Sequence, residues 1–451
     1  MYHYMDERLF PLPEKKVDNE VKPAPGVVRV QKPDRLQVQM QIAALDDLIP
    51  DDHPVRMVWE IVEAYDLERF YRRIKAVEGE AGRPAIDPRL LIAVWLYATL
   101  KGIVSARELA RLCDEHVAFR WIMGGVSVNY HTLADFRVTY EEELDDLLTK
   151  SVAALMSEGI VKLERTAQDG VRIRASAGAS SFRRKPTLKD CLRDAKDAIE
   201  QQKKEGESAH REGERLRRKA AQERHRRERF ERIQKALEEA DQVAERRQKN
   251  RESRRKGKPA RASTTDPEAR VMKMPDGGFR PAYNGQFCID MDSRIIVGVD
   301  VSNQADTKLL QPMVEKIETS YGKRVNEHYV DGGFRSKRVI EELEMKGVQL
   351  YCPIPASYNT KSKHAPEEIL PRDGPGVRAW KHRMVTEEAK EKYQERASTA
   401  EWANALARNR GLQRFLVRGM KKTRAVLLWY ALAHNLIQAV NLRAAAKMQA
   451  S

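Results

Sequence analysis

The spacing of the apolar residues changes near residue 160, and this change limits the fold more than any other feature of the 451-residue chain. Between residues 55 and 159 apolar residues recur at intervals of three and four, which is the period of amphipathic helices. From about Lys162 they alternate with polar residues in period two, as they do in a half-buried strand. The sequence therefore predicts a helical part followed by a part that contains a sheet.

The first part predicts several short helices separated by tight turns. Residues 88–101 carry an apolar stripe, and Ser105 with Glu108 forms a capping box that starts a helix to about Asp114. Thr132 is expected to cap one long helix whose apolar face reaches Leu155. A helical domain of this size suits either a helix-turn-helix DNA reader or a generic packing domain, and the pattern alone favours neither.

The second part predicts the order strand, insertion, hairpin, helix, strand, helix, strand, long helix. Asp169 lies in the middle of the first strand, Asp292 and Ser293 join the hairpin strands, and Gly411 ends the long helix over residues 386–410. A last apolar helix is expected at residues 423–441. This order predicts a ribonuclease-H-like α/β sheet, with three antiparallel strands first and later strands added by helical crossovers.

The predicted domains are an N-terminal arm and the start of the helical domain at residues 1–54, an all-helical DNA-binding domain at 55–160, and a catalytic domain at 161–445. A charged insertion at residues 185–262 interrupts the last of these. The insertion predicts one or two thin helices, in a hairpin broken near Gly206 or Gly213, and then a flexible return over residues 257–270. A solvated charged helix with no specific partner is the alternative interpretation.

Positive charge is concentrated in two segments. The chain has a net charge of +15 and a pI of about 9.5, which favours a polyanionic partner. Residues 203–258 contain 21 Lys and Arg against 12 Asp and Glu, and residues 408–424 contain seven basic residues and no acid. The rest of the chain is about neutral. The acid-free segment is predicted to bind DNA through Arg408, Arg410, Arg414, Arg418, Lys421, Lys422 and Arg424.

The spacing of the cysteines and the length of the apolar runs argue against several other classes of protein. The four cysteines lie far apart without CxxC spacing, which argues against a zinc module and a disulfide scaffold and favours a reducing cytosol. The N-terminus lacks the layout of a signal peptide, and the longest apolar runs are too short to span a bilayer. No membrane role is expected.

Three acidic residues occupy elements that the predicted sheet would bring together. Asp169 lies on the first strand, Asp331 at the end of the fourth strand, which neighbours the first, and Glu401 on the long helix. Phosphodiester hydrolysis and strand transfer use two divalent ions ~4 Å apart, and carboxylate oxygens suit Mg²⁺. Taken singly, each acid has an alternative: Asp before Gly is most often a turn former, and Glu401 reads equally as a solvent-facing helix residue.

The remaining acids near predicted strand ends are assigned no chemistry. Asp290, Asp300 and Asp306 flank strands and a helix start, and they are interpreted as turn or cap residues. Glu395 is the second candidate for the third acid, because it lies on the same helix as Glu401. Six residues separate the two, which places them about 120° apart around a helix of ~3.6 residues per turn.

Four stretches of sequence carry a resemblance: WIMGGVSVNYHTLADFR, AQDGVRIRASAG, YVDGGFRS and YQERASTAEWANALARNRGLQRFLVRGMKKTRAVLLWYALAHNL. They resemble the DDE transposases of bacterial insertion sequences, in the IS-four/IS-five-like superfamily and close to the group numbered eleven-eighty-two. The resemblance implies that Asp169, Asp331 and Glu401 are the catalytic triad and bind the metal. It also maps a Tyr/Arg/Glu/Lys signature onto Tyr393, Arg396, Glu401 and Arg408.

The signature departs from the usual one at two positions. The gap between Arg396 and Glu401 is one residue longer, and the last basic position is Arg408 rather than a lysine. An arginine keeps the charge but presents a planar fork instead of a point charge. Tyr393 and Arg396 are expected to contact DNA as their counterparts do.

The expected function is that of a transposase. It would bind the terminal inverted repeats of an insertion sequence, cleave the ends with two Mg²⁺ (or Mn²⁺) ions and join the 3′-hydroxyls to target DNA. Its partners would be double-stranded DNA and a second copy of the chain, with the charged insertion as one candidate dimer surface. Its place would be the bacterial cytoplasm, at the nucleoid. A metal-dependent nuclease on the same fold and a catalytically idle DNA-binding descendant are the alternatives.

Overall fold

The computed structural model describes residues 42–76, 84–206, 213–249, 257, 259–304, 306–355, 365 and 367–450. The predicted arm before residue 42 lies outside these residues. Contacts divide the chain into residues 1–44 and 45–451, and every helix and strand named below lies in the second unit. The boundary that the sequence places near residue 160 therefore stays a prediction.

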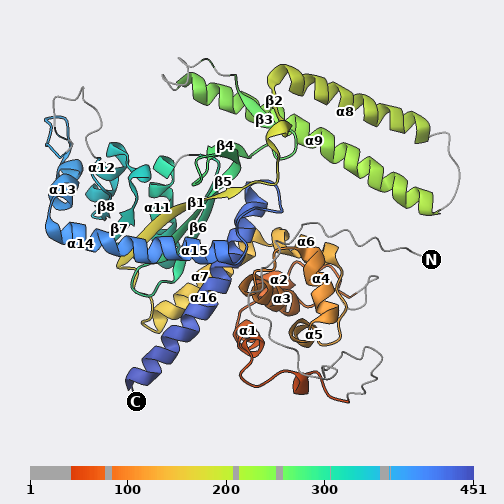
Figure 1. Ribbon diagram of the computed structural model, residues 1–451, viewed down its shortest axis with the longest axis horizontal. Coiled ribbons are helices and arrows are strands. Elements are labelled where there is room, and N and C mark those ends of the chain that lie inside the picture. The colour runs from red at the N-terminus through yellow and green to blue at the C-terminus, as the bar shows by residue number, and fades with distance from the viewer. Residues whose placement is uncertain are drawn as a thin grey trace, which may run out of the picture. The chain divides into compact units, whose positions relative to one another are not determined.

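Among the described residues, the first part of this unit contains seven α-helices (Figure 1). They are α1 (Pro54–Glu63), α2 (Glu68–Tyr71), α3 (Pro88–Leu100), α4 (Ala106–Glu115), α5 (Val117–Met123), α6 (Tyr130–Thr139) and α7 (Glu141–Ser157). The Ser105 cap is confirmed, since its side chain accepts a hydrogen bond from the Glu108 amide. The predicted single helix after Thr132 is wrong: Asn129 caps α6, and the chain breaks at Tyr140 before α7.

The sheet is mixed and contains both antiparallel and parallel strand pairs. Strand β1 (Arg165–Arg174) pairs antiparallel with β5 (Phe279–Asp290), which pairs antiparallel with β6 (Ile296–Ser302) and β4 (Arg270–Lys273). On its other edge β1 pairs in parallel with β7 (Glu327–Val330), and β7 with β8 (Gln349–Tyr351). The path through the sheet is β4-β5-β1-β7-β8, with β6 beside β5. The chain is therefore an α/β protein with a helical N-terminal part.

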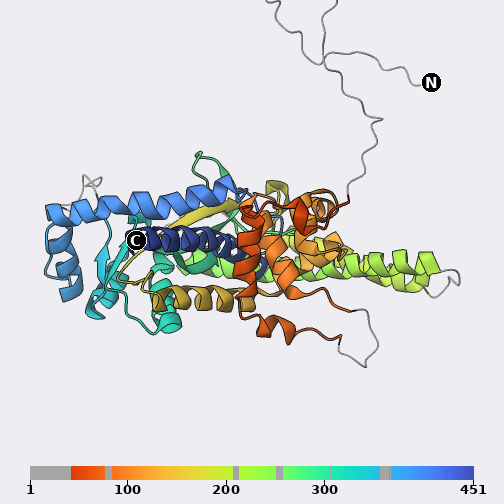
Figure 2. The same cartoon turned by 90° about the horizontal axis from the view of Figure 1, so that it is seen from below.

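Helices cover both faces of this sheet (Figures 1 and 2). Helices α14 (Glu387–Arg396) and α15 (Trp402–Asn409) lie on one side, and α11 (Leu310–Tyr321) lies on the other. Helix α12 (Lys337–Met345) connects β7 to β8 as predicted, whereas α13 (Pro375–Met384) was not predicted. The last helix, α16 (Met420–Ala450), is longer than expected and packs against β6, α7 and α3.

Helix α16 corrects the expectation that no apolar segment is long enough to span a bilayer. By length and composition alone it passes that test among the residues described, but 72% of its apolar window is buried inside the protein. The Trp429 indole on α16 donates a hydrogen bond to the Arg137 carbonyl of α6. Burial of this kind identifies α16 as the core helix that joins the helical part to the sheet.

The charged insertion forms a helical hairpin of α8 (Lys185–Gly206) and α9 (Gly213–Lys249), as the sequence predicts. The two helices lie side by side in Figure 1, and Leu188 packs against Ala236 and Ala240 between them. The predicted flexible return is wrong in part. Strand β3 (Arg261–Ser263) pairs with β2 (Phe182–Arg184) at the base of the hairpin, and β4 joins the main sheet.

Candidate active site

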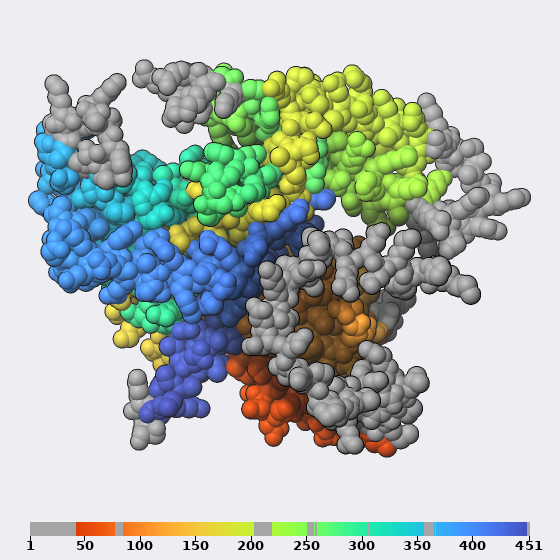
Figure 3. All heavy atoms as spheres, in the orientation of Figure 1, coloured from red at the N-terminus to blue at the C-terminus, as the bar shows by residue number. Residues whose placement is uncertain are grey.

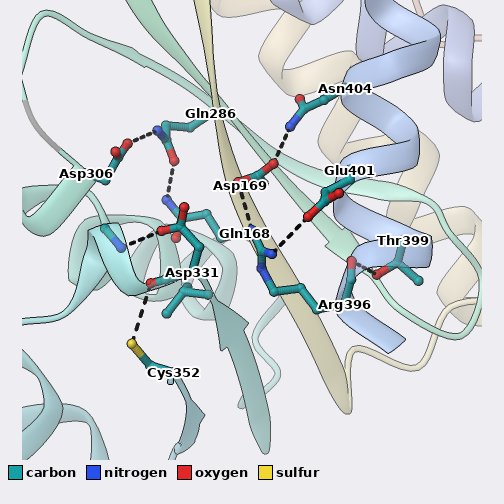
Figure 4. Close-up of polar contacts among 12 residues, drawn as sticks. Gln168, Asp169, Gln286, Asp306, Asp331, Cys352, Arg396, Thr399, Glu401 and Asn404 are labelled. Carbon is teal, nitrogen blue, oxygen red and sulfur yellow. Dashed lines mark hydrogen bonds and ion pairs between the residues drawn. The ribbon is translucent and has the colours of Figure 1, made fainter. Parts of the chain in front are cut away.

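Asp169 lies in the middle of β1, on a strand with a sheet neighbour on each side. Its side chain is 15% exposed, and both carboxylate oxygens are engaged (Figure 4). One accepts a hydrogen bond from Arg396 Nη2 at 2.9 Å, and the other from Asn404 Nδ2 at 2.7 Å. Two elements that cover the sheet, α14 and α15, thus hold one carboxylate on the central strand.

Asp331 follows β7 directly, and β7 is the parallel neighbour of β1. Its carboxylate accepts a hydrogen bond from the Gly333 amide at 2.8 Å, so Asp331 does start a turn, as the alternative interpretation expects. It also faces Asp169. Burial, and to a smaller degree the negative charge of Asp331, raises the pKa of Asp169, while Arg396 opposes the shift. The turn role of Asp331 is therefore confirmed, and its position beside Asp169 leaves the catalytic role as a prediction.

Glu401 ends a π-helical turn, Ala397–Glu401, that separates α14 from α15. A π-turn adds one residue to a helix and often marks a functional site. Arg396 begins this turn, and its Nη1 lies 3.4 Å from Glu401 Oε1, although the two residues are five positions apart. The extra residue in the gap between them is absorbed by the wider turn, so both side chains stay on one face. Glu401 itself remains 60% exposed.

Arg396 connects two of the three predicted acids. Its side chain is only 8% exposed, it contacts both Asp169 and Glu401, and its Nε is buried without a hydrogen-bond partner in the described part of the chain. Tyr393 lies one turn earlier, and its hydroxyl donates to the Val330 carbonyl at 3.2 Å, just before Asp331. Burial raises the pKa of Tyr393 to about 12, so the hydroxyl keeps its proton. Both residues of the predicted signature thus lie at the acids.

Glu395 points away from these acids. Its carboxylate lies 2.9 Å from Arg165 Nη2, at the start of β1, and Arg165 also contacts Asp292. The second candidate for the third acid therefore forms an ion pair at the first residue of β1, four residues before Asp169, in line with the predicted rotation around the helix.

Asp306 lies beside the site, where the sequence interpretation gave it only a turn or cap role. Its Oδ1 accepts hydrogen bonds from Asn284 Nδ2 at 2.6 Å and Gln286 Nε2 at 3.0 Å, and Gln286 accepts one from Gln168. Figure 4 shows this amide chain next to Asp169 and Asp331. No local sequence signal marks it, because its partners come from β5 and β1.

Gly170 makes room for this amide chain. A Cβ at this position would lie 2.6 Å from Gln286 Nε2 and 2.7 Å from Asp306 Oδ1, closer than real Cβ contacts. The Asp169-Gly170 pair is thus no turn. The glycine is needed because polar side chains approach β1 next to Asp169.

The predicted DNA-binding residues of the basic segment fall into two groups. Arg408, Arg414, Arg418 and Lys422 are exposed. The others face inward or pair with α7: burial lowers the pKa of Arg410, Lys421 pairs with Glu142 at 3.1 Å, and Arg424 contacts Glu141 and Asp145. The structure therefore leaves the first group exposed to solvent, pairs Lys421 with α7, and places Arg424 in the packing of α16 on α7.

The donor chemistry of the site suits a divalent cation, but its present arrangement is not a closed metal site. Asp169 and Asp331 offer hard oxygen ligands, and the charge of Asp331 disfavours ionised Asp169, which an added cation would relieve. Across the described ranges no group of three or more His, Cys, Asp or Glu side chains is arranged to hold an ion. Glu401 instead faces Arg396, which supplies positive charge between it and Asp169.

Two family models match the chain. One, described as a transposase domain (DUF772), covers residues 43–139, and the other, a transposase DDE domain, covers residues 352–440. No curated protein and no solved structure matches. Over these two ranges the chain is similar to transposases, and over the second to the DDE transposases. Together the two matches support an insertion-sequence DDE transposase.

The second match spans Tyr393, Arg396, Glu401 and the basic segment, whereas Asp169 and Asp331 lie between the two matched ranges. Their assignment therefore depends on the geometry above.

Proposed function

We propose that this protein binds the ends of an insertion sequence, cleaves them with divalent metal and joins them to target DNA. The main support is the grouping of the three acids. Asp169, on the central strand, lies close enough to Asp331, after the parallel neighbour strand, for the charge of Asp331 to raise the pKa of Asp169. Arg396 forms ion pairs with both Asp169 and Glu401. We also propose a ribonuclease-H-like core and the eleven-eighty-two-like group. The strand order β6-β5-β1-β7-β8, antiparallel first and then parallel, supports that core.

In this proposal Asp169, Asp331 and Glu401 hold Mg²⁺ or Mn²⁺. The bound metal supplies activation of the attacking water or 3′-hydroxyl and stabilisation of the leaving oxygen. Asn404 and Arg396 fix the orientation of Asp169, and the Gly333 amide fixes that of Asp331. Asp169 binds a cation only when ionised, so its raised pKa predicts activity that increases with pH.

The exposed cations beside α15 are proposed to hold the DNA backbone. Arg408, Arg414, Arg418 and Lys422 come after Glu401 in the chain, on α15, on the loop after it and at the start of α16, and have no acid within their own segment. Each phosphate that they neutralise releases counterions, so binding falls as salt rises. The N-terminal helices are proposed to read the terminal repeats, and two copies of the chain, acting in the bacterial cytoplasm, to hold two ends together.

The test is cleavage and joining of the element's end DNA in Mg²⁺. Asp331→Ala is compared with wild type and with Asp292→Ala, which removes an exposed acid that pairs with Arg165 outside the site. We expect wild type and Asp292→Ala to cleave and join, and Asp331→Ala to do neither. If Asp331→Ala cleaves the ends as wild type does, the proposed catalytic triad is wrong.

Two other results favour the alternatives. Cleavage without joining by wild type would indicate a metal-dependent nuclease on this fold. DNA binding without cleavage would indicate an idle DNA-binding protein derived from a transposase.

A further inference from the structure

Helix α9 and the loop after α15 meet at one glutamate. Lys235 Nζ of α9 lies 3.2 Å from Glu268 Oε1, and the Met420 amide donates to Glu268 Oε2 at 2.8 Å. The neighbouring Gly419 amide donates to Asp266 at 3.2 Å, with Gly419 in the left-handed region at a φ of 86°. The base of the hairpin is thereby fixed against the loop after α15, residues 410–419, which we call the basic loop. Arg418 lies just before these contacts, and Arg232 lies one helical turn before Lys235.

This docking brings two like charges together. Burial, and then the nearby charge of Arg418, lowers the pKa of Arg232. The Nε of Arg232 is buried and has no hydrogen-bond partner in the described chain, and Nη1 of its guanidinium lies 3.6 Å from Glu228 Oε2. Arg418 is exposed and has no ion pair among the residues described. Two neighbouring guanidinium groups with too few hydrogen-bond acceptors would be stabilised by a bound anion.

Nearby acids do not fill this need. Asp266, whose charge is influenced by Arg418, is fully buried, and its Oδ1 accepts hydrogen bonds from the Tyr283 hydroxyl at 2.6 Å and the Gly419 amide. Its Oδ2 is buried and accepts no hydrogen bond from Arg418 or any other described residue. Burial raises the pKa of Asp266, which disfavours its charged form. Glu268 is taken by Lys235 and the Met420 amide.

We propose that Arg232 and Arg418 together bind one phosphate of the DNA backbone, so that the α8–α9 hairpin contacts the substrate. This inference rests on the proposed function, because it takes DNA as the substrate. Arginine forks suit phosphate oxygens, and a phosphate between the two guanidinium groups would offset their repulsion. The hairpin then becomes a DNA-contacting arm rather than the dimer surface that its charge alone also allows.

The surface on either side is suited to continue this contact. Arg224, Arg227 and Arg229 are exposed on α9 beyond Arg232, and Arg414 and Arg408 are exposed on the other side of Arg418. Figure 3 shows the hairpin, in yellow to yellow-green, exposed on the face that it draws. A duplex that leaves the acids past the basic loop would therefore meet further cations along α9.

The inference is tested by binding of full-length protein to a fluorescein-labelled mixed-sequence duplex, because phosphate contacts do not depend on sequence. Arg232→Gln, Arg418→Gln and the double variant are compared with Arg246→Gln. Arg246 is an exposed arginine of the same helix, about 21 Å further along at ~1.5 Å per residue. Thermal unfolding without DNA checks that each variant folds, and removing either like charge is expected not to lower Tm.

We expect each single variant to bind about tenfold more weakly, the loss of one charge-assisted contact. The double variant should lose less than the product of the two single losses, because both groups hold the same phosphate. Between ~50 and ~200 mM salt its slope of log affinity against log salt should fall by about 0.9, the value for one phosphate. Arg246→Gln should bind with nearly wild-type affinity.

Three outcomes would overturn the inference. If Arg232→Gln and Arg418→Gln bind DNA as Arg246→Gln does, the hairpin contact is wrong while the proposed function stands. If the two variants change sedimentation from dimer to monomer with DNA affinity unchanged, the hairpin is an assembly surface. If wild type itself does not bind DNA, the proposed function fails and the inference fails with it.

Discussion

At the scale of single residues, the site holds charges that work against the stability of the fold. Asp169 is buried, and Asp331 adds negative charge beside it. Arg396, with its Nε unpaired among the described residues, offsets only part of that cost. Clustered like charges that destabilise a fold are common at cation-binding sites. Removing one of these charges is then expected to stabilise the fold while it abolishes function.

Replacing Asp331 by Asn is expected to abolish DNA cleavage without lowering stability. The amide oxygen keeps the acceptor for Gly333 while the repulsion of Asp169 disappears, so we expect a gain of about 1 kcal/mol and a Tm higher by about 1 °C. Mn²⁺ should raise the Tm of wild type and leave that of the variant unchanged, since only a bound ligand stabilises the folded state. An equal Mn²⁺ shift in both proteins would contradict the role of Asp331 as a ligand.

Replacing Arg396 by Gln is expected to destabilise the protein in a pH-dependent way. The variant leaves Asp169 buried without its cation, which raises the pKa of Asp169 further and costs about 3 kcal/mol at neutral pH. An acid with a raised folded-state pKa is penalised above that pKa and not below its unfolded value of 3.8.

The Tm difference between Arg396→Gln and wild type should therefore be largest near neutral pH and shrink as pH falls towards 4. Thermal unfolding across this range measures it. A difference that grows on acidification would show that Arg396 does not compensate Asp169.

At the scale of elements, the π-turn decides where Glu401 points. Residues five apart share a face on a π-turn, as residues four apart do on an α-helix. Ala397 and Ser398 are exposed there, whereas Thr399 and Ala400 are buried. The turn thus keeps the buried sides of α14 and α15 in register while one extra residue loops outward.

Deleting Ser398 is expected to convert the π-turn into a regular α-helix. Arg396 and Glu401 would then be four positions apart and remain in contact, so we expect Tm within a few degrees of wild type and measurable DNA cleavage. Deleting Glu391, an exposed residue of regular α14, is the matched control. That deletion rotates the start of α14 by about 100° and should cost several kcal/mol through loss of the Thr386 cap and buried Ala389. Equal losses in both deletions would contradict this role of the π-turn.

Gly170→Ala tests the close approach beside Asp169. The added methyl group would meet Gln286, Asp306 and Asn284 within 2.8 Å, so we expect a loss of about 1 to 3 kcal/mol and weaker cleavage. Gly178→Ala is the control, because a Cβ there meets nothing closer than 3.6 Å. Urea unfolding of the two variants measures the difference, and similar midpoints would show that the amide chain adapts freely.

The elements differ in how far the sequence predicts them. Strand β1, the hairpin of β5 and β6 and the capped helix α4 follow local signals of alternation, turn residues and a side-chain cap. The break at Tyr140 has no such local signal, and strand β3 depends on pairing with β2, which is distant in the chain. The same holds in the site. Sequence patterns identify Asp169 and Asp331, whereas Asp306 and Asn404 are identified only by their side-chain contacts in the folded protein.

At the scale of the whole molecule, one helix ties the parts of the second unit together. Helix α16 packs against β6, α7 and α3, and Arg424 on it contacts Glu141 and Asp145 of α7. Composition predicted that the whole basic segment binds DNA, but charge in a sequence does not distinguish a cation that faces solvent from one that neutralises a neighbouring helix. Arg408, Arg414, Arg418 and Lys422 keep the proposed role because they are exposed.

Joining of a pre-cleaved end to plasmid DNA in Mg²⁺ tests the central claim, that acids from β1, the end of β7 and the π-turn form one catalytic centre. The assay compares wild type with Asp169→Asn, Asp331→Asn and Glu401→Gln, and with Glu395→Gln, which removes an acid from the same helix that faces Arg165. We predict that each of the first three lowers joining by about 1,000-fold, roughly 4 kcal/mol of transition-state stabilisation, and that Glu395→Gln joins as wild type does. Wild-type joining by any of those three variants, or an equal loss in Glu395→Gln, would contradict the account.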